Sequence, residues 1–133
     1  MLFTFKVLLL FIMIFCHLID DYKIQGILAN MKQKRWWQKN YNHHLYKNDY
    51  KIALIEHAFS WSFMITLPLL FLAFYQENVI LGWIIIISYF TNTIGHAIID
   101  NEKANNYSIN LITDQILHLF QIIFTWIIAC AAI

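Results

Sequence analysis

Long apolar runs separated by polar stretches dominate the chain, and each run is long enough to cross a membrane. A helix rises about 1.5 Å per residue, so about 20 residues span the roughly 30 Å hydrocarbon core of a bilayer. The runs lack the alternation of a half-buried β-strand. We therefore predict an all-α polytopic membrane protein, one domain over residues 1–133, with four transmembrane helices in an up-down bundle at about residues 2–19, 52–75, 79–99 and 109–133.

The composition agrees with a chain that is embedded in lipid. Charged residues make up 13% of the sequence, about half of the roughly 25% found in soluble domains. The formal net charge of +1 gives no reason to expect a nucleic-acid partner. The two cysteines, Cys16 and Cys130, are predicted near opposite faces of the bilayer, too far apart for a disulfide.

The basic residues predict the orientation of the chain in the membrane. The polar stretch 22–51 contains Lys23, Lys32, Lys34, Arg35, Lys39, Lys47 and Lys51. Loops rich in Lys and Arg remain on the cytoplasmic side. We therefore expect a bacterial inner-membrane protein with this loop in the cytoplasm and both termini outside. Trp36, Trp37 and several tyrosines in the loop favour helices lying among lipid headgroups over nucleic-acid binding.

The few ionisable residues near the ends of the apolar runs share one spacing. Three pairs are four residues apart: His17 and Asp21, His96 and Asp100, Asp114 and His118. That separation places both side chains on the same helix face, one turn apart. His57 is a seventh such residue, near the start of the second run. Because ionisable groups in membrane segments are costly, all seven are candidate functional residues.

An up-down bundle brings these seven residues into one layer on the predicted cytoplasmic side. Helix dipoles favour acidic residues at N-terminal ends and cations at C-terminal ends. Asp114 fits this rule, whereas Asp20, Asp21, Asp100 and His57 are expected at the opposite kind of end. A bound cation would resolve the conflict. Salt bridges from Lys23 and Lys103 are the alternative.

Imidazole and carboxylate side chains are ligands of zinc and related divalent ions. Seven candidate ligands exceed what one tetrahedral ion needs, so we expect two ions, or one ion with a spare carboxylate. Asp21 or Asp100 is the expected general base, and Lys103 or Lys23 is expected to stabilise developing negative charge. The groups expected around the ligands are Gln25, Gln115, Asp20 and Ser60.

The same residues resemble the motifs of a family of small bacterial and phage membrane proteins, the domain-of-unknown-function family numbered 3307. Its opening motif, His-x-x-x-Asp-aromatic-x-x-Gln, is similar to residues 17–25, and its lone histidine is similar to His57. Its closing motifs correspond to residues 96–103 and 114–118. This resemblance covers nearly the whole chain and implies no particular activity. A looser similarity links the layout to membrane-bound metal-dependent hydrolases.

Three functions are compatible with this pattern. The first is a metal-dependent hydrolase at the inner leaflet, acting on an ester, amide or phosphoester of a small molecule or lipid. The second is a transporter of metal ions or protons, although Thr66, Gln121 and Thr125 are the only polar groups that we expect beyond the layer. The third is a non-enzymatic phage or bacterial membrane protein with a structural His/Asp cluster. Membrane lipids are expected partners, and the pattern is compatible with a homo-oligomer.

Overall fold

The computed structural model describes residues 2–41 and 43–133, and helices form all of its regular structure. The four long helices are α1 (Leu2–Ile19), α4 (Asp49–Tyr75), α5 (Val79–Asn101) and α6 (Leu111–Cys130). Five short helical segments are η1 (Asp20–Ile24), α2 (Leu28–Met31), α3 (Lys34–Asn40), η2 (His44–Tyr46) and η3 (Glu102–Asn106). No β-strand occurs in the described residues. The predicted all-α fold is confirmed.

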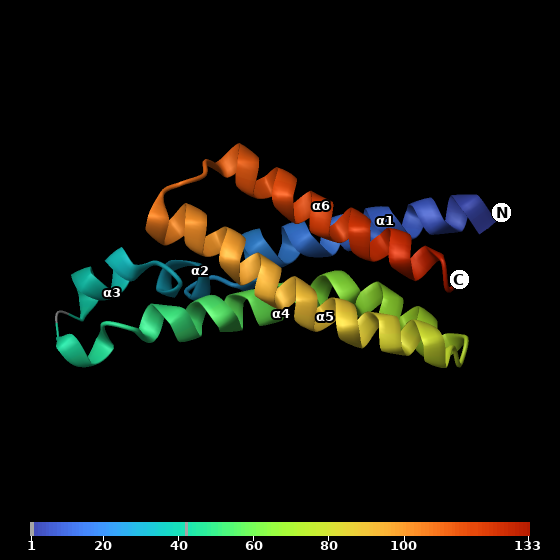
Figure 1. The fold of residues 1–133 in the computed structure, drawn as a ribbon, viewed down its shortest axis with the longest axis horizontal. Helices are drawn as coiled ribbons and strands as arrows, with labels where there is room; N and C mark the ends of the chain where they lie inside the picture. Colours follow the sequence, from blue (N-terminus) through green and yellow to red (C-terminus); the bar gives the residue numbers. More distant parts are fainter. Residues whose placement is uncertain (1, 42) are drawn as a thin grey trace.

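The four long helices form a closed bundle. Helix α4 packs against α1 and α5, while α6 packs against α5 and α1. Consecutive long helices run in opposite directions, and the two termini lie at the same end (Figure 1). Four helical stretches are long and apolar enough to cross a membrane: Phe3–Ile24, His44–Tyr75, Val79–Asn106 and Leu111–Cys130. These stretches identify the chain as an integral membrane protein.

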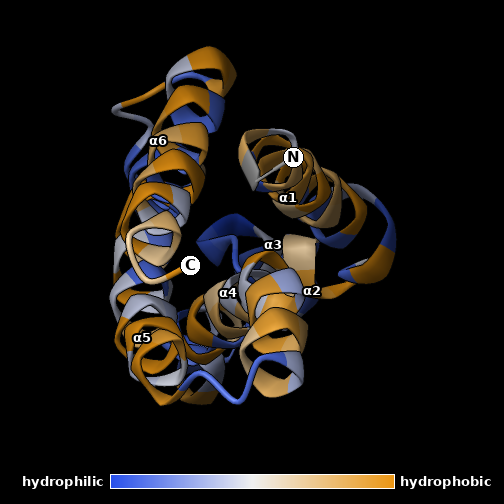
Figure 2. Ribbon diagram, turned by 90° about the vertical axis from the view of Figure 1, so that its right-hand side faces the viewer, coloured by the Kyte–Doolittle hydropathy of each residue, from blue (hydrophilic) through white to orange (hydrophobic). Residues whose placement is uncertain are grey.

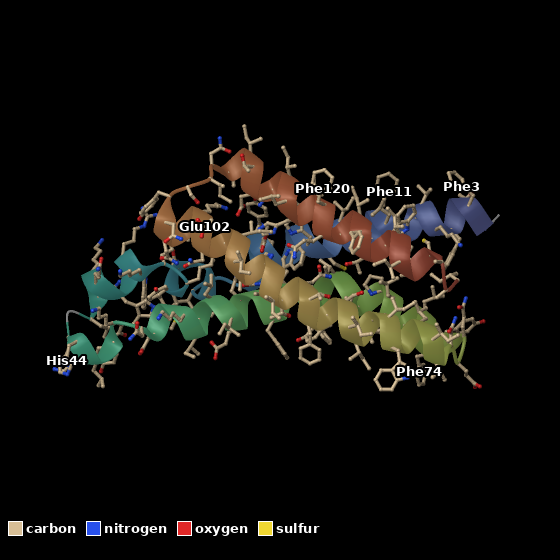
Figure 3. All side chains as sticks on the ribbon, in the orientation of Figure 1. Phe3, Phe11, His44, Phe74, Glu102 and Phe120 are labelled. Atoms are coloured by element: carbon tan, nitrogen blue, oxygen red, sulfur yellow. The ribbon has the colours of Figure 1, made fainter. Side chains whose placement is uncertain are left out.

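The outer surface of the bundle is apolar, as lipid contact requires. Most of the ribbon of the long helices has hydrophobic colours, whereas α3 is strongly hydrophilic (Figure 2). Phe11, Phe74 and Phe120 point outward from three helices (Figure 3), and each is more than half exposed. Inside the bundle, the largest buried apolar side chains are Met13, Trp61, Ile65, Leu69, Leu81, Ile85 and Ile122. Exposed apolar surface of this extent marks a membrane protein.

Asparagine side chains fix the starts of the last two long helices. The Asn78 side-chain oxygen accepts a hydrogen bond from the Leu81 amide of α5 at 3.0 Å. Likewise, Asn110 accepts from the Thr113 amide of α6 at 2.9 Å. Such N-caps satisfy amides that have no partner within the helix.

The observed helix ends differ from the prediction at the end of the bundle that contains the ionisable residues. Helix α4 begins at Asp49, three residues before the predicted start. Helices α1 and α5 pass directly into the π-helical segments η1 and η3. The apolar pattern stops at Ile19 and Ile99, but the polar residues that follow include buried ones, Asp20 and Asp100. The helical backbone therefore continues where a surface loop was predicted.

Gly95 allows α5 and α6 to approach closely beside the ionisable residues. A Cβ atom at Gly95 would lie 2.6 Å from Nε2 of Gln121. This Nε2 donates to the Asn92 carbonyl at 3.3 Å, and the Gln121 Oε1 lies 3.3 Å from Nδ1 of His118. A methyl group at position 95 would therefore push Gln121 away from both partners.

We expect the free energy of unfolding of Gly95→Ala to be lower than that of Gly82→Ala. Both glycines lie in α5, so both variants gain the same helix propensity. A Cβ at Gly82 meets nothing within 4 Å, whereas Gly95→Ala should lose about 1 kcal/mol for a displaced hydrogen bond. Titration of the two proteins with a denaturing detergent measures the difference. Equal unfolding free energies would contradict the close approach.

Candidate metal centre

The structure brings the seven ionisable residues into one continuous cluster. His17 lies on α1, Asp21 on η1 and His57 on α4; α5 and α6 each contribute a pair, His96 with Asp100 and Asp114 with His118. Every member has a ring nitrogen or a carboxylate oxygen within 3.8 Å of such an atom of another member. Six of the seven are at most 2% exposed, and Asp21 is 13% exposed. We call these seven residues the His/Asp cluster.

Asp100 occupies the centre of the His/Asp cluster. Its Oδ2 lies 2.7 Å from Nε2 of His57 and 3.2 Å from Nε2 of His96. Its Oδ1 lies 3.4 Å from Nε2 of His118. One carboxylate thus faces three imidazoles from three different helices, which is a donor set suited to a divalent ion.

Two groups of three residues have ligand atoms close enough to share an ion. One group is Asp21, His57 and His96, and the other is His96, Asp100 and His118. Within each group, one ligand atom per residue lies within 4.8 Å of the others. His96 belongs to both groups. The arrangement can therefore accommodate one ion or two.

Several buried atoms of the cluster have no hydrogen-bond partner among the described residues. They are Oδ1 of Asp21, Oδ1 of Asp114, Nδ1 of His57 and both ring nitrogens of His96. Although Nε2 of His96 is 3.2 Å from Asp100, the geometry is not that of a hydrogen bond. A buried polar atom without a partner costs about 1–3 kcal/mol. Coordination of a cation would satisfy several of these atoms, so the donor set fits a divalent ion.

Two of the predicted ligands, His17 and Asp114, lie outside the two groups and have other partners. Nδ1 of His17 accepts a hydrogen bond from the indole Nε1 of Trp61 at 2.7 Å. Oδ2 of Asp114 accepts from Lys103 at 2.6 Å and from Gln115 at 3.0 Å. Oδ1 of Asp114 still lies 3.4 Å from His118. These two residues border the groups that could hold an ion.

Trp61 is a part of the centre that the sequence analysis missed. Its ring is fully buried and stacks on His96 with a centroid separation of 4.2 Å. Through its hydrogen bond to His17 it also fixes the orientation of that ring. Trp61 follows His57 by four residues, so the spacing that identified the three His/Asp pairs also places Trp61 on the cluster face.

Lys32 is the second missed residue, and it enters the centre from the loop. Its Nζ lies 2.6 Å from Oδ2 of Asp100 and 2.6 Å from Nε2 of His57. Lys23, which the sequence analysis considered as a salt-bridge partner, is exposed instead. Nothing in the sequence distinguishes Lys32 from the other basic residues of its loop, because its position depends on how α2 and α3 fold back.

Asp20, Gln25 and Ser60 form a buried network beside the cluster. Oδ1 of Asp20 accepts from Ser60 at 2.9 Å, and Oδ2 accepts from Nε2 of Gln25. This Nε2 also donates to the His57 carbonyl at 3.1 Å. The π-helical bond from the Gln25 amide to the Asp20 carbonyl brings residues five apart together. The network joins η1 to α4 next to His57.

The observed helix ends remove the predicted conflict with helix dipoles for His57 and Asp100, but not for Asp21. His57 lies more than two turns inside α4, and helical backbone continues past Asp21 through η1 and past Asp100 through η3. Dipole effects fall off within the first and last turns. Within the cluster, Asp114 lies in the first turn of α6, and Asp21 lies in the short η1, which ends three residues later at Ile24. The buried atoms without partners are therefore the stronger reason to expect a cation.

A pocket of about 330 Å³ leads from the surface to the cluster. We call it the entrance pocket. Its lining includes Asp21, Tyr22, Lys32, Arg35, His57, Asp100, Lys103, Tyr107, Leu111, Asp114 and Gln115. The predicted catalytic residues Asp21, Asp100 and Lys103 therefore all face the same space. Lys23 is not among the residues that line it.

Comparison of the chain with protein-family models, with curated proteins and with solved structures finds no match. The fold and the His/Asp cluster are therefore the basis of the functional argument.

Proposed function

We propose that the chain is an integral-membrane, metal-dependent hydrolase whose centre is the His/Asp cluster at one membrane boundary. The observation that carries this proposal is a buried set of imidazoles and carboxylates with partnerless atoms, open to solvent through the entrance pocket. The resemblance to the domain-of-unknown-function family numbered 3307 and to membrane-bound metal-dependent hydrolases is part of the same proposal.

The depth of the cluster supports a substrate near the lipid headgroups. His57 and Tyr75 are 18 residues apart in α4, which corresponds to about 27 Å of helix. This length is close to the roughly 30 Å thickness of the hydrocarbon core. If α4 crosses the bilayer to Tyr75, His57 lies at the opposite boundary. The basic loop lies at the same end, and we infer a cytoplasmic centre with both termini outside a bacterial inner membrane.

The group of His96, Asp100 and His118 is the better holder of an ion. All three of its residues are at most 2% exposed, whereas the other group includes Asp21, which is 13% exposed. Zinc suits two imidazoles and a carboxylate. When bound, a divalent ion would supply a Lewis acid and make a water molecule acidic enough to attack an ester near neutral pH.

The remaining polar groups have positions suited to hydrolysis. Asp21 is the most exposed member of the cluster, and its Oδ1 has no hydrogen-bond partner, so it is the group best placed to accept a proton from water. Lys103 faces the entrance pocket and can stabilise negative charge. Gln25 and Gln115 contact the groups next to the ligands and keep them in place.

Metal analysis of the purified protein tests this proposal. We expect near-stoichiometric zinc or another divalent ion after purification without chelator. Removal of the ion should abolish hydrolysis of aryl ester and aryl phosphate substrates, while circular dichroism still shows a folded bundle. Failure to bind zinc at a near-stoichiometric level, even after incubation with zinc, would rule out the hydrolase.

A structural cluster is the second candidate, and two ion pairs favour it. Lys32 pairs with Asp100, and Lys103 pairs with Asp114, each at 2.6 Å. These pairs could join the loop and η3 to the bundle without any ion. In that case the protein should show no hydrolysis, and a chelator should leave its stability unchanged. If the cluster instead holds a structural ion, removal of that ion should lower the free energy of unfolding.

A further inference from the structure

Equal numbers of basic and acidic side chains line the entrance pocket. Three basic side chains line it, Lys32 after α2, Arg35 on α3 and Lys103 on η3. Three carboxylates also line it, those of Asp21, Asp100 and Asp114. The formal charges cancel when the histidines are neutral. Any divalent ion at the centre therefore makes the pocket cationic.

Lys32 occupies a position where a bound ion would compete with it. Its Nζ contacts Oδ2 of Asp100 and Nε2 of His57, and both are ligand atoms of the cluster. An ion coordinated by the same atoms would displace the ammonium by contact and by repulsion. The flexible four-carbon side chain can then turn into the entrance pocket, which Lys32 already lines.

We propose that Lys32, Arg35 and Lys103 recognise a phosphate group, so that the substrate of this centre is a phosphoester. The proposal rests on the hydrolase proposed above. Lysine and arginine bind phosphate through charge-assisted hydrogen bonds. Lys103 already pairs with Asp114, but once an ion has displaced Lys32 from Asp100, a neutral ester or amide would leave Lys32 and Arg35 without an anionic partner. Tyr22 and Tyr107 add hydroxyl groups to the same wall.

The reaction needs only water as a co-reactant. The water oxygen forms a bond to phosphorus while the ester P–O bond breaks. A proton from the water passes to Asp21 and then to the departing alkoxide, which leaves as an alcohol. Lys32, Arg35 and Lys103 compensate the negative charge of the phosphate oxygens throughout.

The test is calorimetric titration of the zinc-loaded, full-length protein in detergent micelles with inorganic phosphate. We expect Lys32→Met and Arg35→Gln each to weaken phosphate binding about tenfold, which corresponds to about 1.4 kcal/mol. The matched control is Lys39→Met, which removes the same charge from an exposed position of α3 that does not line the pocket. Zinc content, measured on every sample, should not fall in Lys32→Met, because the competing ammonium is gone.

The outcomes separate this proposal from the one on which it rests. Full zinc occupancy with no phosphate binding, or with equal binding in all four proteins, would overturn the phosphate proposal and leave the hydrolase intact. Absence of zinc from the wild type would contradict both the phosphate proposal and the hydrolase proposal. Arg35→Gln keeps the test decisive if Lys32→Met does not fold, since Arg35 is exposed. Rates on a dissolved aryl phosphate and on phosphatidic acid in mixed micelles distinguish a free substrate from a lipid.

Discussion

Asp100→Asn should abolish metal binding and weaken the bundle at the same time. The Asp100 carboxylate contacts three imidazoles and the Lys32 ammonium. Loss of an outer partner alone weakens metal sites about 10- to 100-fold, so loss of a central ligand should cost more than about 100-fold. Because Lys32 would lose its buried counter-ion, we also expect the free energy of unfolding to fall by up to about 3 kcal/mol.

Zinc titration and denaturing-detergent unfolding measure the two effects of Asp100→Asn. Glu56→Gln is the matched control, since Glu56 precedes His57 in α4 but is exposed. It makes the same change of charge at the same end of the bundle and should leave both quantities within error of the wild type. Wild-type zinc affinity in Asp100→Asn would exclude Asp100 as a ligand.

Trp61→Ala should be the most destabilising change in the apolar interior. Trp61 is fully buried, stacks on His96 and donates to His17. Truncation of a buried tryptophan to alanine costs about 3–5 kcal/mol because a large cavity remains. We also expect weaker zinc binding, since the rings of His17 and His96 lose the contact that orients them.

The control for Trp61→Ala is Trp83→Ala on α5, because Trp83 is 62% exposed. Its unfolding free energy in a detergent titration should differ from the wild type by no more than about 0.5 kcal/mol. Trp61→Phe retains an aromatic ring but cannot donate to His17, so about 1 kcal/mol should be lost. Similar values for Trp61→Ala and Trp83→Ala would contradict the packing described above.

The membrane helices could be predicted from the sequence because one strong physical requirement determines them. A helix of about 20 apolar residues has few alternatives in lipid, and the α-helical bounds of α1 and α5 accordingly lie within two residues of the prediction. The local rule of four-residue spacing was equally informative. It placed His96 with Asp100 and His118 with Asp114 on shared faces, and the structure has both pairs in contact.

The remaining features depend on long-range packing, which a single sequence does not encode locally. Lys32 reaches Asp100 only because α2 and α3 fold back against α4. The segments η1 and η3 have no apolar pattern, so nothing in the sequence predicted that their backbone is helical. Trp61 was overlooked for another reason. An aromatic residue in an apolar run is usually part of the core, and only the packing of α1 against α4 shows that Trp61 contacts His17.

The two ligand groups also differ in when they can form during synthesis. The group of Asp21, His57 and His96 needs only η1, α4 and α5, all of which precede α6 in the chain. The group of His96, Asp100 and His118 is complete only after α6 has joined the bundle. Both groups use His96. If the proposed ion binds the first group during synthesis, insertion of the last helix would offer this ion a second, more deeply buried set of ligands. Metal loading and membrane assembly would then be successive steps of one process.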